Sequence, residues 1–125
     1  MGKNHSPKFL STVDQSRKVI NECDIDQFSA MLNDGNLLTV IDVREQHEFD
    51  AGHFEGALHL SKGVIERDIE KHPISEEDRI VLYCGGGFRS ALAAESLARM
   101  GYVNVSSLWG GWRSLVAAGL ASPDQ

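Results

Sequence analysis

The fold is decided by the stretch Ile80-Val81-Leu82-Tyr83-Cys84-Gly85-Gly86-Gly87-Phe88-Arg89-Ser90. Its first four residues form an apolar run, which is typical of a strand buried on both faces of a sheet. The three glycines predict a loop. Residues 90–100, rich in Ala and Leu, predict a helix that ends at Gly101. Ligands of parallel sheets bind beyond the carboxyl ends of strands, and Cys84 occupies such an end, so we expect it in a binding site.

The same alternation of strand and helix continues on both sides of this stretch. We expect strands at residues 18–20, 37–43, 57–60, 79–83 and 103–108, and helices at 24–33, 44–50, 64–71, 90–100 and 112–118. Strands that are joined through helices pair in parallel. The sequence therefore predicts one α/β domain over residues 18–121. Residues 1–17 are polar and lack a periodic pattern, so we expect a flexible N-terminal tail.

Cys84 is the candidate nucleophile. Gly85, Gly86 and Gly87 remove every Cβ from the next turn of chain, so their N–H groups can point inward and bind an anion. The following helix presents its positive end to the same place, and Arg89 adds a charged fork of donors. Each feature favours the thiolate over the thiol. The alternative is that Cys84 is a small buried hydrophobe and the glycines only turn the chain.

Composition excludes several classes of function. The chain has 125 residues, 42% of them hydrophobic, and a net charge of −6 that argues against a nucleic-acid partner. No apolar run is long enough to span a membrane and no secretory signal is visible, so we expect a cytoplasmic protein with no membrane partner. The two cysteines, Cys23 and Cys84, form neither a disulfide framework nor a zinc-binding pair. A myristoylation-like pattern begins at Gly2, but a flexible start is the simpler interpretation.

Three separated segments resemble the rhodanese homology domain, and the resemblance covers about residues 19–120. The segments are residues 41–57, residues 83–90 and Leu108-Trp109-Gly110-Gly111-Trp112. Any one of them would be a weak match by itself, whereas three in this order make a strong one. The resemblance implies a three-layer α/β fold, with a central, mostly parallel five-stranded sheet flanked by helices.

The resemblance also implies sulfur transfer. The Cys84 thiolate would take the outer sulfur of a small anionic donor such as thiosulfate. The persulfide would then pass this sulfur to cyanide, a thiol or a sulfur-accepting protein. The residues implied to hold the persulfide are Gly85, Gly86, Gly87, Phe88, Arg89 and Ser90. No cofactor and no metal are implied.

The length of the loop bears on the choice of reaction. Four residues separate Cys84 from Arg89. Phosphatases of the related fold use five, which widens the loop to fit a phosphate, so the shorter loop favours sulfur transfer over a phosphatase or arsenate reductase. A sulfur-carrier or redox-sensing module without turnover would keep the same cysteine, and this alternative stays open. The glycines and Phe88 stand where many thiosulfate-using relatives have Lys or Arg, so the natural donor also stays open.

Four other side chains are candidates for supporting roles. Asp42 and Arg44 end the first apolar strand, and we expect them to brace the fold, with substrate contact as the alternative. Lys62 could supply the local positive charge that an anionic donor needs in an acidic protein. Cys23 is interpreted as structural, with a role as resolving thiol if it lies near Cys84.

Overall fold

The computed structural model describes residues 5–123, so Gly2 and its myristoylation-like pattern lie outside the described residues. Its centre is a parallel five-stranded sheet with the strand order β1-β5-β4-β2-β3. The strands are β1 (Asn21–Cys23), β2 (Thr39–Asp42), β3 (Leu58–His59), β4 (Ile80–Tyr83) and β5 (Val105–Leu108). The expected α/β fold with a five-stranded parallel sheet is confirmed.

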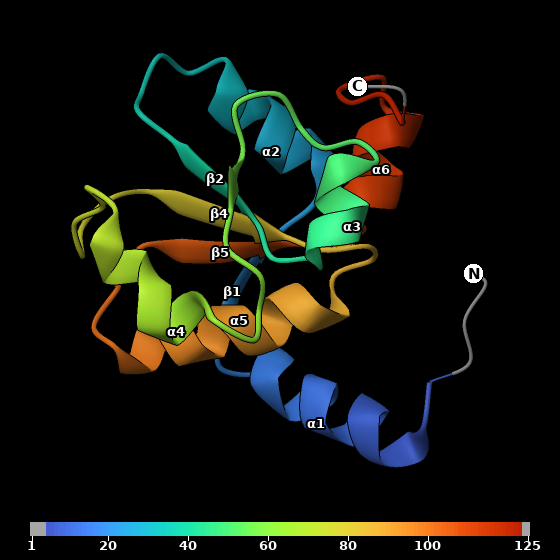
Figure 1. Ribbon diagram of the computed structural model, residues 1–125, viewed down its shortest axis with the longest axis vertical. Coiled ribbons are helices and arrows are strands. Elements are labelled where there is room, and N and C mark those ends of the chain that lie inside the picture. Colours follow the sequence, from blue (N-terminus) through green and yellow to red (C-terminus); the bar gives the residue numbers. More distant parts are fainter. Residues whose placement is uncertain (1–4, 124–125) are drawn as a thin grey trace.

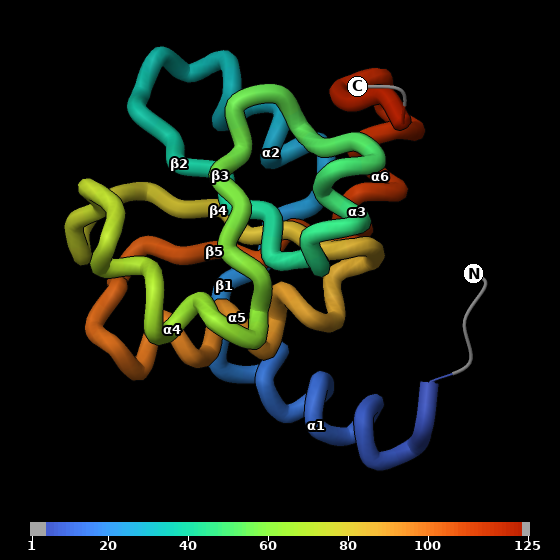
Figure 2. Tube along the Cα trace, viewed as in Figure 1, coloured from blue at the N-terminus to red at the C-terminus, as the bar shows by residue number. Residues whose placement is uncertain are grey.

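Helices cover both faces of the sheet (Figure 1). One face carries α2 (Ile25–Leu32) and α6 (Gly111–Ala117), and the other carries α4 (Ile65–Asp68), the 3-10 turn η1 (Ile69–Lys71) and α5 (Phe88–Arg99). The short helix α3 (Gln46–Asp50) follows the carboxyl end of β2. Helix α1 (Pro7–Arg17) packs against α5 on the side away from the sheet (Figure 2).

The side chains of β4 show how the sheet joins its two helical layers. Residues along a strand point alternately to opposite faces. Ile80 and Leu82 belong to the core that α4 and α5 cover, whereas Val81 and Tyr83 belong to the core beneath α2 and α6. All four side chains are fully buried. Because both faces are covered, β4 needs an unbroken apolar run, and this run is the signal that the sequence displays.

The N-terminal segment differs from the prediction. Residues 7–17 form helix α1, so the expected flexible tail is wrong for these residues. The Ser6 side chain caps the helix by accepting a hydrogen bond from the Phe9 N–H at 3.3 Å. Pro7 takes the first helical position, where a missing N–H has no cost. The side chain of Val13 is buried, and the ordered unit therefore begins before residue 18.

The first strand also lies three residues beyond its predicted place. The apolar pair Val19 and Ile20 suggested a strand at residues 18–20, but β1 is Asn21–Cys23 and Val19 is exposed. Strand β1 lies at the edge of the sheet and pairs with β5. An edge strand of three residues needs little apolar surface, and its sequence therefore carries a weak signal.

Three strands end at the same edge of the sheet. Strands β2, β4 and β5 end at Asp42, Tyr83 and Leu108. Because neighbouring strands are parallel, the segments that follow them meet at this edge, where ligands of α/β sheets bind. None of the described helices is long and apolar enough to cross a bilayer.

Candidate active site

Cys84 directly follows β4 and is 1% exposed. Its Sγ accepts hydrogen bonds from the N–H groups of Gly87, at 3.2 Å, and Ser90, at 3.3 Å. The Ser90 hydroxyl lies 3.5 Å from Sγ and 2.8 Å from the hydroxyl of Ser107. Two backbone donors at the start of α5 thus face the sulfur, an arrangement that stabilises negative charge on it.

The backbone conformation of the cysteine loop requires glycine at its third glycine position, Gly87. Gly87 has a φ of +116°, and a Cβ there would lie 2.9 Å from Cε3 of Trp109. Beside Cys84, a cavity of about 730 Å³ is lined in part by Gly85, Gly86, Phe88 and Arg89. Within the described chain, no group accepts a hydrogen bond from the backbone N–H of these four residues. Their amides are therefore available to an anionic ligand.

The segment that starts α6 holds this loop in place. The N–H groups of Gly110 and Trp112 donate to the carbonyl oxygens of Gly86, at 3.0 Å, and Cys84, at 2.7 Å. Gly111 has a φ of +49°, and a Cβ on it would collide with the Cys84 carbonyl oxygen. The Gly-Gly-Trp segment near the C-terminus is thus the backbone support of the cysteine loop.

Arg89 lies beside the loop, but its fork of donors is engaged by a carboxylate. Its Nη1 and Nη2 donate to the two carboxylate oxygens of Glu48 at 2.8 and 3.2 Å. This ion pair lowers the pKa of Glu48 to about 2, and the hydrogen bond to Glu48 raises the pKa of Arg89. A Cβ at Gly85 would lie 3.3 Å from Arg89 Nη2, so the guanidinium stays next to the loop. Arg89 therefore adds positive charge to the site while Glu48 fixes its position.

Asp42 and Arg44 are brought together as the sequence suggested. The Arg44 backbone N–H and guanidinium both donate to the fully buried Asp42 carboxylate, with Nη2 to Oδ2 at 2.8 Å. Arg44 Nη2 also donates to Gly52 O at 2.7 Å, and the guanidinium lies 4.6 Å from the Trp112 ring centroid. These contacts are those of a brace, and Arg44 also lines the cavity.

Two of the other candidates lie away from the site. Lys62 is not among the residues that line the cavity; its N–H donates to Val43 O at 2.9 Å. Cys23 is 3% exposed and packs in the core beneath α2 and α6, whereas Cys84 belongs to the core on the opposite face of the sheet. Burial, and then the charges of Asp24 and Glu22, raise the pKa of the Cys23 thiol to about 11. The sheet separates the two thiols, which contradicts a resolving role for Cys23.

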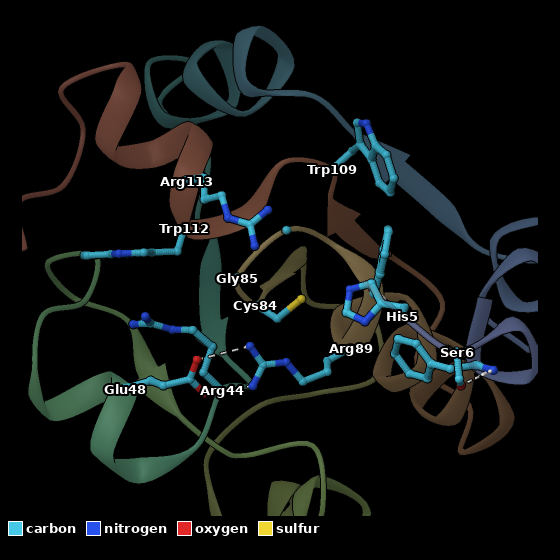
Figure 3. Close-up of a pocket in the computed structure, with 13 residues that line it drawn as sticks. His5, Ser6, Arg44, Glu48, Cys84, Gly85, Arg89, Trp109, Trp112 and Arg113 are labelled. Atoms are coloured by element: carbon cyan, nitrogen blue, oxygen red, sulfur yellow. Dashed lines mark hydrogen bonds and ion pairs between the residues drawn. The ribbon is translucent and has the colours of Figure 1, made fainter. Parts of the chain in front are cut away.

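The structure adds residues that the sequence interpretation missed (Figure 3). Arg113 approaches the loop from α6, because a Cβ at Gly86 would lie 3.2 Å from its Nη1. Within the described residues, no carboxylate pairs with Arg113, in contrast to Arg44 and Arg89. His5 and Phe9 line the same cavity from the N-terminal segment. The cap at Ser6-Pro7 and the helical spacing of Phe9 and Val13 could have revealed this helix, but its position over the loop depends on tertiary packing.

Comparison with known families gives a match over most of the chain. A family model described as "Rhodanese-like domain" matches residues 24–118. A Schizosaccharomyces pombe protein provisionally named a mitochondrial thiosulfate sulfurtransferase is 32% identical over 115 residues. That match covers 78% of this chain and 80% of the relative.

Two other relatives match as parts of longer proteins. A Bacillus subtilis protein provisionally named the sulfur carrier YrkF is 29% identical, and the match covers 75% of this chain but 50% of the relative. A tRNA uridine(34) hydroxylase of Bacillus cereus is 42% identical over 58% of this chain and 24% of its own length. The chain thus spans half or less of both relatives.

Solved structures show the same fold at low identity. The human single-domain sulfurtransferase TSTD1 superposes with a TM-score of 0.71 at 22% identity, covering 77% of this chain and 95% of that one. A Rhodopseudomonas palustris protein of unknown function, described as a possible tyrosine phosphatase, gives 0.72 at 23% identity, covering 95% and 96%. At these identities the likeness shows the fold alone.

Proposed function

Because the chain belongs to the rhodanese-like domain family, we propose that it is a sulfurtransferase that carries sulfane sulfur as a persulfide on Cys84. One observation carries the proposal. The Cys84 sulfur receives two backbone N–H groups, and it lies beside four more amides that have no acceptor among the described residues. A terminal persulfide sulfur is an anion of the size that such a loop can surround.

The first half-reaction loads the cysteine. The Cys84 thiolate attacks the outer sulfur of the donor, and a new S–S bond forms while the donor S–S bond breaks. Its electron pair leaves with the remainder of the donor, which is sulfite when the donor is thiosulfate. The charge on the new terminal sulfur is stabilised by the amides of residues 85–89 and by the positive end of α5.

The second half-reaction unloads the cysteine. An acceptor such as cyanide, a thiol or a protein thiolate attacks the terminal sulfur, and the electron pair of the broken S–S bond returns to Cys84 as thiolate. Arg113, which has no carboxylate partner among the described residues, would hold the anionic donor and its leaving group at the loop. Asp42 and Arg44 would act as a brace, and Ser90 as a donor to the loaded sulfur.

The proposal also covers the cellular location, the sulfur donors and the sulfur acceptors. We propose a cytoplasmic location, small anionic sulfur donors, and thiol, cyanide or protein acceptors, without nucleic-acid or membrane partners. Both cysteines of the chain are free thiols, which suits a reducing compartment. Because the net charge is −6, an anionic donor needs local positive charge, which Arg113 and Arg89 would supply.

Intact-mass spectrometry tests this proposal directly. Incubation with thiosulfate should add one sulfur atom to the protein, and cyanide should remove it as thiocyanate. Cys84→Ser should abolish both steps, whereas Cys23→Ser is the matched control and should retain them. If no sulfane donor adds sulfur to Cys84, the proposal fails.

Sulfur loading and release, together with a phosphatase assay, distinguish the proposed function from a sulfur carrier and from a phosphatase. A carrier without turnover would accept sulfur but release almost none to small acceptors, and one relative is named a sulfur carrier. A phosphatase would show Cys84-dependent hydrolysis of an aryl phosphate and no sulfur adduct.

A further inference from the structure

We propose that the N-terminal segment formed by His5 and Phe9 completes the active-site cavity and selects sulfur donors that carry an apolar body. This inference rests on the proposed sulfurtransferase function and adds a specificity-determining wall to it. The segment lies outside residues 24–118, the part that matches the family model. It therefore lies outside the part of the chain that the family model describes.

The wall is a set of aromatic rings at one side of the cavity. The His5 ring centroid lies 4.9 Å from that of Phe88, and Phe9 lies 6.3 Å from Phe88. Phe88 in turn lies 5.7 Å from Trp109. Figure 3 shows His5 and Trp109 on the same side of Cys84. All four residues line the cavity, so two segments distant in sequence and the cysteine loop together offer a continuous aromatic surface to a ligand.

Helix α1 is fixed well enough to hold this wall in position. Phe9, Val13 and Ser16 follow one another at helical spacing and share one face of the helix. Val13 is 1% exposed, and Ser16 Oγ donates to Glu95 of α5 at 2.6 Å. At the end of the helix, the Arg17 guanidinium lies 3.7 Å from the Trp109 ring centroid.

Size and charge indicate what the cavity accepts. Its volume of about 730 Å³ falls in the range of sites for organic ligands and far exceeds what an inorganic anion fills. Arg113 approaches the loop from α6 at Gly86, whereas the rings of His5 and Phe9 line the cavity from the N-terminal segment. A donor with an anionic head near Cys84 and an apolar body against Phe9 satisfies both features. Thiosulfate has the head but lacks the body.

Organic thiosulfonates, R–SO2–S⁻, are suitable probes because only R differs between them. Transfer forms a bond between Cys84 Sγ and the terminal sulfur and breaks the donor S–S bond, whose electron pair leaves with the sulfinate R–SO2⁻. No oxidant or reductant is needed. Benzenethiosulfonate carries an aromatic ring that can pack against the wall, whereas methanethiosulfonate carries only a methyl group.

The experiment compares kcat/KM for the two donors in the wild type, Phe9→Ala and Leu10→Ala. Leu10 is 38% exposed and does not line the cavity, so Leu10→Ala is a matched truncation on α1. Phe9→Ala should lower the benzene-to-methane ratio of kcat/KM by about two- to tenfold, the range expected for one aromatic contact. Leu10→Ala should leave the ratio unchanged. The intrinsic reactivities of the two donors cancel when the ratios are compared between proteins.

One further variant makes the result decisive. Phe9→Leu keeps an apolar side chain and should retain part of the ratio; it replaces Phe9→Ala if that variant does not fold. Equal ratios in all folded variants, while Cys84 still gains sulfur, would refute the wall and leave the sulfurtransferase intact. If no donor adds sulfur to Cys84, the proposed function fails and the inference fails with it.

Discussion

Glu48 fixes the position of the Arg89 side chain through an ion pair. Arg89 is the only basic residue in the cysteine loop, yet its fork is held by Glu48 through two hydrogen bonds. An unpaired arginine would be free to move into the loop and occupy the place proposed for the transferred sulfur. The carboxylate therefore keeps the charge near Cys84 and the loop open.

A pH-dependent stability should follow from this pair. Hydrogen bonding to Arg89 lowers the pKa of Glu48 from 4.5 to about 2. Its contribution to stability is therefore complete above about pH 4.5 and is lost as the pH falls towards 2. Glu48→Gln should cost about 1–2 kcal/mol of unfolding free energy at pH 7. The difference between the wild type and this variant should shrink below pH 4.5.

Urea unfolding at several pH values measures this difference. Glu55→Gln is the control, because Glu55 is exposed and its carboxylate has no hydrogen bond or ion pair with any residue that the structure describes. Subtracting variant from wild type removes the effect of other carboxylates that titrate in the same range, such as Asp34. A difference that stays constant from pH 7 to pH 3 would contradict the role assigned to the pair.

At the scale of elements, the start of α6 is the support on which the cysteine loop rests. Gly111 and Gly119 both have positive φ, at +49° and +75°. A Cβ on Gly111 would lie 2.9 Å from the Gly85 carbonyl carbon and closer still to Cys84 O, whereas a Cβ on Gly119 meets nothing within 4 Å. A side chain at either position would strain the backbone, but only a side chain at Gly111 would also collide with the cysteine loop.

Alanine substitution at the two glycines tests this support. Gly119→Ala should cost about 1–2 kcal/mol, which is the strain of a left-handed conformation. Gly111→Ala adds the collision and should cost about 2 kcal/mol more, together with slower loading of Cys84. Urea unfolding and the sulfur-loading rate are the two measurements. Equal costs at both positions would mean that the loop does not depend on the approach of α6.

The elements differ in how well their sequence predicts them. Strand β4 was predicted because burial on both faces forces an apolar run, and helix α5 was predicted because its sequence is rich in Ala and Leu. Helix α1 was missed because only a narrow face of it is buried, at Val13 and Ser16. Strand β1 was misplaced because a short edge strand needs few apolar residues. Local sequence signals follow burial, and these two elements have little of it.

Some residues of the candidate site were predicted from the sequence and others were missed. The loop residues and the pair of Asp42 and Arg44 were predicted, because adjacent residues at a strand end carry their own pattern. Arg113 and Phe9 were missed, because they reach the cavity only through the packing of α6 and α1. Nothing in the residues beside them marks that contact. Lys62 was placed near the site on charge alone, and charge does not indicate position.

The whole molecule explains why one of its two cysteines is chemically special. Cys84 lines a cavity at the carboxyl edge of the sheet, and Cys23 lies in the core on the opposite face. Cys84 receives two backbone N–H groups on its sulfur, whereas burial raises the pKa of Cys23 to about 11. In the proposed reaction, the parallel sheet between them would keep a Cys84 persulfide away from the second thiol, whose attack would form a disulfide and release sulfide.

This separation predicts the behaviour of the protein towards thiol reagents. In the folded protein, iodoacetamide should modify Cys84 at least tenfold faster than Cys23, since a buried thiol of high pKa has little thiolate. In denaturing guanidinium both cysteines should react at similar rates. Peptide mass spectrometry after mild peroxide treatment should show oxidised Cys84 but no disulfide between Cys84 and Cys23. Such a disulfide in the folded protein would require the sheet to open, and its detection would overturn the view that the two faces are independent.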